Sequence, residues 1–249
     1  MRFSFRSVTA MLGLALCAGG HATQVIVHDP VMAQDGARYY LFGTGPGIPF
    51  YSSADLLNWQ REGRVFAGAP AWASRAAPGF NGHIWAPDVQ QHQGKFYLYY
   101  SVSAFGKNRS GIGVTVSKTL DPRSPDYRWE DQGMLLQSVP GRDDWNAIDP
   151  NIVEDGEGGA WMAFGSFWSG VKLVKLDHNW TQLAEPQQWH AIARRNVPVR
   201  SAASRPERAR SKRHFSSAKM ATTTCSPRGA CAARARTAPT AWWSAARRQ

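Results

Sequence analysis

Short runs of aromatic and β-branched residues recur along most of the chain, separated by clusters of Gly, Pro, Asp and Asn. Runs bounded in this way are typical of β-strands, and no window has the period of an amphipathic helix. Asp35-Gly36, Gln93-Gly94 and Asp155-Gly156 precede such runs as hairpin turns do. The pattern predicts strands at Gln24–His28, Arg38–Thr44, Phe50–Ser53, Lys95–Val102, Gly111–Ser117, Ala160–Ser166 and Val171–Leu176.

An acidic residue next to a proline precedes three of the aromatic runs, at Asp29, Asp88 and Asp149, with gaps of 59 and 61 residues. A repeat of this length with several strands per unit predicts blades of a β-propeller. The first strand of each blade lies nearest the axis, so acids at equivalent positions converge on one site. The alternative is that Asp-Pro merely begins turns, but three copies in register favour the repeat.

Two converging carboxylates indicate glycoside hydrolysis. An inverting glycosidase needs one carboxylate to activate water and one carboxylic acid to protonate the leaving oxygen, and a third acid raises the pKa of the donor. Aromatic rings stack on the apolar faces of sugars. Trp145 and Phe167 are candidates for this role, although the blade core is favoured for both. Trp85, Phe105 and Trp168 lie at strand ends, which favours sugar contact.

Four motifs then resemble glycoside hydrolase family 43, and its endo-acting arabinanases most: V-H-D-P, H-I-W-A-P-D, W-N-A-I-D-P-N and G-S-F-W-S-G. The resemblance covers about residues 24–195. It implies an all-β, five-bladed β-propeller that cleaves α-1,5-linked L-arabinofuranose chains with inversion. About three blades are recognisable in this chain, followed by an irregular C-terminal tail.

The resemblance also implies roles for individual residues. Asp29 matches the general base, and Asp149 matches the acid that tunes the proton donor and orients the substrate. His28 is given no role. Relatives often hold an axial calcium through a histidine of the last blade, which is not recognisable here, so no metal or cofactor is expected. The positions that match substrate-contacting segments are Gly106, Asn146, Ala147, Ile148, Asp149, Ser166, Phe167 and Trp168.

The charge of the chain is unevenly distributed. Residues 1–196 hold 17 basic and 17 acidic side chains, whereas residues 197–249 hold 10 Arg, 2 Lys and one Glu, so the net charge of +11 belongs to the tail. An Arg/Ala-rich segment with few apolar residues is predicted to be disordered. A basic tail that binds nucleic acid is the alternative, which we do not expect in an exported protein.

The tail also lacks an expected catalytic residue. The family places its general-acid glutamate in an E-A-P-F-like segment that opens the fourth blade, but here that place reads Arg210–Phe215 and holds no acid. Read one frame over, the codons for Ser211–Phe215 can encode E-A-P-F. We therefore hypothesise a frameshift between about residues 190 and 208, which would make residues 23–196 a partial propeller domain and residues 197–249 an out-of-frame tail.

The N-terminal segment predicts export. Arg2 and Arg6 precede an apolar stretch over Val8–Leu16, and small residues end at Ala22, so residues 1–22 are interpreted as a signal peptide. The apolar stretch is too short to span a bilayer. Residues 23–196 contain no cysteine, which excludes a disulfide framework or a thiolate metal site there. We expect a secreted or periplasmic protein.

These observations predict a glycoside hydrolase of the arabinanase type, inverting in mechanism but inactive as written because the general acid is missing. The alternatives are a non-catalytic arabinan-binding protein, a non-functional gene product, or an exo-acting arabinofuranosidase or β-xylosidase of the same family. The expected partner is plant cell-wall arabinan or an arabino-oligosaccharide. No nucleic acid or membrane partner is expected, and the folded chain is expected to be a monomer.

Overall fold

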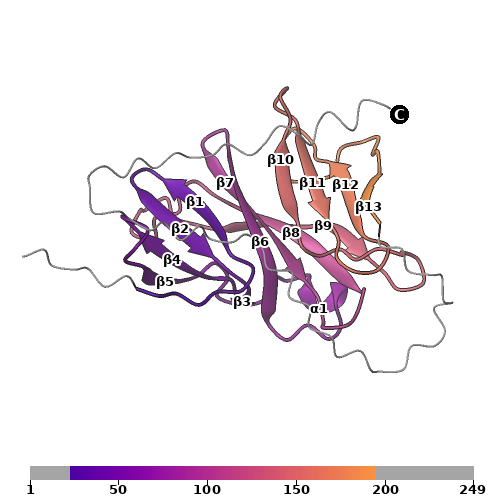
Figure 1. Ribbon diagram of the computed structural model, residues 1–249, viewed down its shortest axis with the longest axis horizontal. Helices are drawn as coiled ribbons and strands as arrows, with labels where there is room; N and C mark the ends of the chain where they lie inside the picture. The colour runs from indigo at the N-terminus through magenta and orange to yellow at the C-terminus, as the bar shows by residue number, and fades with distance from the viewer. Residues whose placement is uncertain (1–22, 195–249) are drawn as a thin grey trace, which may run out of the picture. The chain divides into compact units, whose positions relative to one another are not determined.

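The computed structural model describes residues 23–194, which form three antiparallel sheets in chain order (Figure 1). The predicted signal peptide and tail lie outside the described residues. In the first sheet the strand order is β1-β2-β4-β5. Its strands are β1 (Val31–Asp35), β2 (Arg38–Phe42), β4 (Pro49–Ser53) and β5 (Gln60–Arg64).

The second sheet is the largest, with the strand order β3-β6-β7-β8-β9. Its short edge strand β3 comes from the loop between β2 and β4 and pairs with β6, so it joins the first two sheets. A one-turn helix, α1 (Ala73–Ala76), precedes β6. The strands are β3 (Gly45–Pro46), β6 (His83–His92), β7 (Lys95–Val102), β8 (Ser110–Ser117) and β9 (Glu130–Ser138).

The third sheet has the order β10-β11-β12-β13, with strands β10 (Asn151–Glu154), β11 (Ala160–Phe164), β12 (Val171–Lys175) and β13 (His190–Ala193). The all-β expectation is therefore confirmed, with one sheet for each repeat of the sequence. The five-bladed ring stays a prediction, because residues 23–194 do not test its closure. Within these residues no helix is long and apolar enough to cross a membrane.

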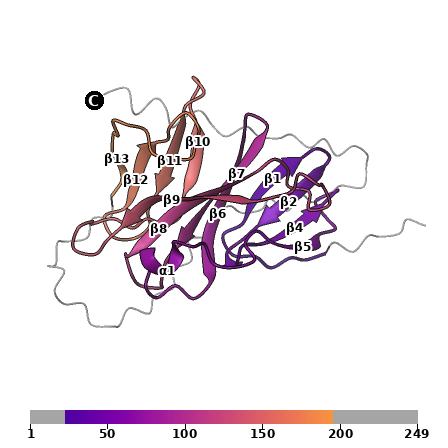
Figure 2. The ribbon, with the colours of Figure 1, turned by 180° about the vertical axis from the view of Figure 1, so that it is seen from behind.

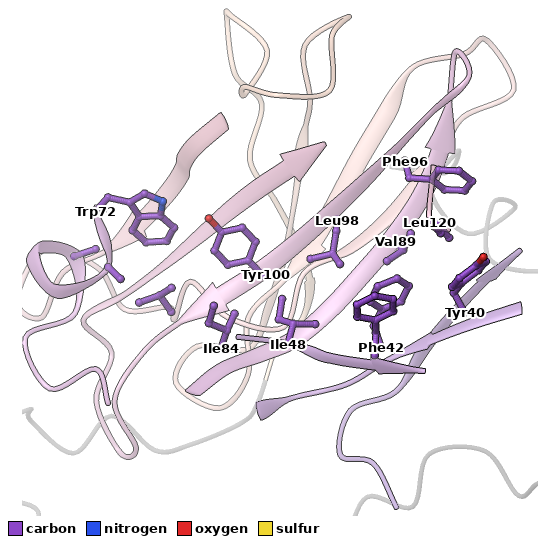
Figure 3. Close-up of a cluster of buried hydrophobic side chains, with 14 of the residues drawn as sticks. Tyr40, Phe42, Ile48, Trp72, Ile84, Val89, Phe96, Leu98, Tyr100 and Leu120 are labelled. Atoms are coloured by element: carbon purple, nitrogen blue, oxygen red, sulfur yellow. The ribbon is translucent and has the colours of Figure 1, made fainter. Parts of the chain in front are cut away.

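Strand β7 explains how the sheets pack. Phe96, Leu98 and Tyr100 point into a core shared with the first sheet (Figure 3). The alternate residues Tyr97 and Tyr99 point into a second core shared with the third sheet. The second sheet therefore lies between the other two, as Figures 1 and 2 show. A strand buried on both faces needs a continuous apolar run, which is the pattern seen here.

The strand predicted over Gln24–His28 is wrong. That segment has no regular secondary structure, and β1 begins only at Val31. Pro30 has no N–H to donate to a ladder, and Asp29 adopts a left-handed φ of 47° that breaks the extended path. The other six predicted strands are confirmed with small changes at their ends. The hairpin turns at Asp35-Gly36, Gln93-Gly94 and Asp155-Gly156 are also confirmed.

Several strands carried no recognisable signal. Strand β5, with the sequence Gln-Arg-Glu-Gly-Arg, is an edge strand that is largely exposed, so it lacks the alternation of a half-buried strand. Strand β6 contains Pro87, which usually argues against a ladder strand. The ladder accommodates this proline with a register shift between Trp85 and Asp88.

The structure also corrects the register of the repeat. Asp29, Ala86 and Asp149 each precede a proline and have left-handed φ values of 47°, 42° and 58°. The residue of the second sheet that is equivalent to Asp29 and Asp149 is therefore Ala86, and Asp88 comes two positions later. Asp88 is 6% exposed and belongs to the packing between sheets rather than to an open site.

Candidate active site

One end of the three sheets gathers most of the residues that the sequence singled out. In an antiparallel pair the start of one strand lies beside the end of the next. Asp29 precedes β1 beside the end of β2, Trp85 pairs with Ser101 near the end of β7, and Asp149 precedes β10 beside the end of β11. We call this the Asp29 end. It also carries the loops after β2, β7 and β11.

Asp29 is an accessible carboxylate with two close partners. Its side chain is 41% exposed. Thr44, just after β2, donates a hydrogen bond of 2.7 Å to its Oδ2 atom. The Nδ1 atom of His28 lies 2.7 Å from the same oxygen. The backbone is fixed as well, because the N–H of Thr44 donates to the carbonyl of His28 over 2.8 Å.

Asp149 is held in the same way at the start of the third sheet. Its backbone N–H donates to the hydroxyl of Ser101 over 3.0 Å, and the N–H of Gly165 donates to the carbonyl of Ile148 over 2.7 Å. Both acids occupy left-handed backbone conformations, which cost free energy in a non-glycine residue and cluster at functional sites.

The electrostatics link the two acids. Burial raises the pKa of Asp149, and the negative charge of Asp29 raises it further. A hydrogen bond from Ser166 and the charge of His28 act in the opposite direction. Asp149 is nevertheless exposed to solvent as a whole residue. Its carboxyl group is therefore crowded by protein atoms but is not enclosed. A Coulombic effect of this kind acts over a limited distance, so it indicates that the two carboxylates lie near each other.

Exposed aromatic side chains lie on two loops at the Asp29 end. Phe105, on the loop after β7, is 95% exposed, and Phe167 and Trp168, on the loop after β11, are 65% and 36% exposed. Trp85 is half-buried in β6, and Gly106 is exposed beside Phe105. Rings exposed to solvent at the end of the sheets that carries the acids suit the stacking of sugar faces. Their assignment as sugar contacts stays a prediction.

The segment before Asp149 faces inward. Asn146, Ala147 and Ile148 are all buried, so the side chains of Ala147 and Ile148 belong to the core. The Oδ1 atom of Asn146 accepts hydrogen bonds of 2.7 Å from Ser110 and 3.3 Å from Ser138. These side chains support the backbone that carries Asp149. Their predicted contact with substrate is not tested.

Sequence reasoning missed Thr44 and Ser101. Thr44 follows β2 and Ser101 lies near the end of β7. Each hydroxyl accepts the N–H of the residue before proline in the next sheet, at 2.8 Å from Ala86 and 3.0 Å from Asp149. A hydroxyl residue one or two positions after the aromatic run was the available signal. Its bonds join residues 42 and 48 positions apart, which no local pattern reveals.

Other features of the described residues do not compete with this site. Two hollows of about 270 and 360 Å³ lie at the opposite end of the sheets, near Lys95 and near Asp155, and their linings are mainly polar and charged. Within residues 23–194 no group of three or more His, Cys, Asp or Glu side chains is placed to hold a metal ion. The absence of a metal site stays a prediction for the whole chain.

Comparison with known proteins places these features in a family. The model of the glycosyl hydrolases family 43 matches residues 23–204. An extracellular exo-α-(1→5)-L-arabinofuranosidase of Cellvibrio japonicus is 60% identical over 191 residues, which are 77% of this chain and 54% of that protein. An extracellular endo-α-(1→5)-L-arabinanase of Bacillus subtilis is 40% identical over 160 residues, 63% of this chain and 48% of that protein.

Solved structures of arabinanases support the same family assignment. The α-L-arabinanase of Cellvibrio cellulosa complexed with arabinohexaose is 63% identical with a TM-score of 0.68, covering 69% of this chain and 55% of that one. The native arabinanase of Bacillus subtilis is 37% identical with a TM-score of 0.65, covering 70% and 59%. The chain spans about half the length of the curated relatives it matches. With its paired acids and three sheets, the chain belongs to the glycosyl hydrolases family 43.

Proposed function

We propose that residues 23–194 carry the general base and a large part of the sugar-binding surface of an inverting hydrolase for α-1,5-linked L-arabinan. Asp29 is the base, and Asp149 tunes the proton donor and orients the sugar. The observation that carries this proposal is the placement of both acids, in left-handed conformations, just before the first strands of two sheets at the Asp29 end. The Coulombic effect of Asp29 on Asp149 is consistent with this placement. The relatives named for α-(1→5)-arabinan cleavage supply the substrate class.

In this mechanism the Asp29 carboxylate takes a proton from a water molecule while the water oxygen bonds to the anomeric carbon. The glycosidic bond breaks, and its electron pair goes to the leaving sugar oxygen, which needs a proton from a general acid. The configuration at the anomeric carbon inverts. Burial is the main cause of the raised pKa of Asp149, and the charge of the nearby Asp29 adds to it.

The chain as written lacks the general acid that the family resemblance places at Arg210–Phe215, outside the described residues. General acid help is worth roughly 10²- to 10⁴-fold in rate. We therefore propose negligible hydrolysis of arabinan, with the sugar-binding surface retained.

The frameshift hypothesis is tested by sequencing the gene across codons 190–215. A coding sequence whose shifted frame does not encode the glutamate segment would refute it.

An activated substrate separates the base from the missing acid. A 2,4-dinitrophenyl α-L-arabinofuranoside has a leaving group that departs as a stable anion, so its hydrolysis needs water activation but no proton donor. We expect slow, Asp29-dependent release of dinitrophenolate with β-L-arabinose as the first product, and no cleavage of linear arabinan. Asp126→Asn is the matched control, because its carboxylate is exposed on the connection between β8 and β9, away from the Asp29 end.

Four outcomes of these experiments distinguish between the proposals. Release of arabino-oligosaccharides from linear arabinan by the pure protein would overturn the proposed inactivity. Equal turnover by the native chain and by Asp29→Asn would overturn the role of Asp29 as base. Calorimetric binding of arabino-oligosaccharides without turnover of either substrate would support the non-catalytic binding protein. Neither binding nor turnover would indicate a non-functional gene product.

An exo-acting enzyme is the second candidate, and the 60% identity to a relative named as an exo-acting arabinofuranosidase favours it. An open groove gains affinity as the oligosaccharide lengthens, whereas a closed pocket stops gaining after a few sugars. Calorimetry with arabinobiose through arabinohexaose therefore discriminates endo from exo geometry. A β-xylosidase would instead prefer xylobiose.

Export completes the proposal. The two relatives described above are named extracellular, and the signal interpretation covers residues 1–22. We propose a secreted or periplasmic monomer whose partner is plant cell-wall arabinan. The mass of the exported protein tests this directly, since cleavage after Ala22 leaves Thr23 as the first residue.

A further inference from the structure

The hydroxyl of Thr44 takes part in two hydrogen bonds that join three elements. Its oxygen accepts the N–H of Ala86 from the second sheet over 2.8 Å. Because that oxygen is already an acceptor, its own hydrogen is directed elsewhere, and it points to Asp29 Oδ2 over 2.7 Å. The hydrogen bonds therefore run in one direction, from the Ala86 N–H through Thr44 to the carboxylate.

The same arrangement commits one of the two carboxylate oxygens of Asp29 to contacts with protein. The hydrogen-bonding partners of this carboxylate among the described residues, Thr44 and His28, both reach Oδ2. The side chain remains 41% exposed. The Oδ1 atom is therefore the oxygen available to a water molecule in the site.

We propose that Thr44 is a positioning residue for the general base, holding Asp29 with Oδ2 bound to protein and Oδ1 turned to the reacting water. This inference rests on the proposed function. Asp29 needs such support because it precedes β1 and adopts a left-handed conformation, outside any strand ladder. Thr44 acts through Asp29 and takes no part in proton transfer.

A purely structural role for Thr44 is the competing explanation, since its bond to Ala86 also ties the first sheet to the second. Ser101 shows that such a tie exists without a bond to a catalytic carboxylate, because its hydroxyl accepts the N–H of Asp149 in the same way. The two roles predict different kinetics. A structural tie affects folding whether or not residue 29 is an aspartate, whereas positioning needs the carboxylate.

The test uses the full chain and the dinitrophenyl arabinofuranoside. Thr44→Val removes the hydroxyl at nearly constant volume, and Thr44→Ser keeps it. We expect Thr44→Val to lower kcat about tenfold with KM changed less than about twofold, the effect of losing one hydrogen bond to a charged group. Thr44→Ser should restore kcat. In an Asp29→Asn background Thr44→Val should not lower the residual rate further.

A measurement that needs no turnover accompanies the kinetics. The carboxyl ¹³C signal of Asp29, assigned by its loss in Asp29→Asn, reports the hydrogen bonds at that group. It should shift in Thr44→Val and return in Thr44→Ser. An unchanged signal and unchanged kcat in Thr44→Val overturn the positioning role while leaving the proposed function intact. No Asp29-dependent turnover by the native chain overturns the proposed function, and the ¹³C signal then still decides whether Thr44 orients Asp29.

Discussion

The carboxylate of Asp88 accepts a hydrogen bond of 2.7 Å from the backbone N–H of Ile152. Asp88 lies in β6, and Ile152 lies near the start of β10 and is buried in the core between the second and third sheets. The bond therefore ties the two sheets three residues beyond Asp149. It satisfies a buried backbone donor that would otherwise lack a partner.

Removing this acceptor should destabilise the fold. Asp88→Ala leaves the Ile152 N–H buried without a partner, so we expect the free energy of unfolding to fall by about 1–3 kcal/mol. Asp88→Asn keeps an oxygen acceptor and should lose less. Urea unfolding at pH 7 measures both. Asp126→Ala, at an exposed carboxylate, should stay within about 0.5 kcal/mol of the native chain, and equal losses for Asp88→Ala and Asp126→Ala would contradict the bridging role.

The same carboxyl should make stability depend on pH. Burial raises the pKa of Asp88 above its usual range, against the opposing hydrogen bonds of Ile152, Gln90 and Asn151. The folded chain therefore binds this proton more tightly than the unfolded chain. Its contribution is fully present below the ordinary pKa near 3.8 and is lost as pH rises through the raised pKa. The difference in unfolding free energy between the native chain and Asp88→Asn, measured from pH 3 upward, should fall across that window and then level off.

The sequence predicts a strand well where both faces of that strand are buried. It predicts a strand poorly where the strand is an exposed edge. The run Phe96–Tyr100 predicts its strand because both faces of β7 are covered. The polar strand β5 carries no such signal because it is an exposed edge. Asp88 is an acid beside a proline but is not equivalent to Asp29 and Asp149, because the property that the three sheets share is a left-handed residue before proline, which is Ala86 in the second sheet.

The residues of the candidate site also fall into two groups, those that a local sequence pattern reveals and those that only the packing of sheets reveals. Asp29 and Asp149 are recognisable because the Asp-Pro pair repeats beside strong strands. Thr44 and Ser101 are not, because their hydroxyls contact backbone in a neighbouring sheet. Such contacts depend on how sheets stack, a property of three-dimensional packing that local residue patterns do not contain.

Neutralising Asp29 should change the titration of Asp149. Burial is the main cause that raises the pKa of Asp149, and the charge of Asp29 adds to it. In Asp29→Asn the second contribution is absent, so the pKa of Asp149 should fall toward its usual range. Ser166→Ala should act in the opposite direction, because it removes a hydrogen bond that lowers this pKa. A carboxyl ¹³C titration of Asp149 checks both signs, and no shift in Asp29→Asn would mean that the two acids do not share a site.

Gly170 should tolerate no side chain. Its φ is +91°, and a Cβ there would overlap the backbone carbonyl oxygen of Ala193 in β13. Its N–H also closes the turn that carries Phe167. Gly170→Ala should therefore cost about 2 kcal/mol or more in unfolding free energy. Gly106→Ala is the matched control, with φ +75° and nothing within 4 Å of the added Cβ, and should cost about 1–2 kcal/mol from backbone strain alone.

Phe105 provides the sharpest test of sugar binding at the Asp29 end. It is 95% exposed, so Phe105→Ala removes no core contact and should leave the unfolding free energy within about 0.5 kcal/mol. If the ring stacks on arabinose, its loss should weaken binding of arabinohexaose about 2- to 12-fold, since an aromatic stack contributes roughly 0.5–1.5 kcal/mol. Leu57→Ala is the control, because Leu57 is 56% exposed on the turn between β4 and β5, at the opposite end of the first sheet. Calorimetry that finds the same affinity in both variants would remove Phe105 from the sugar-binding surface.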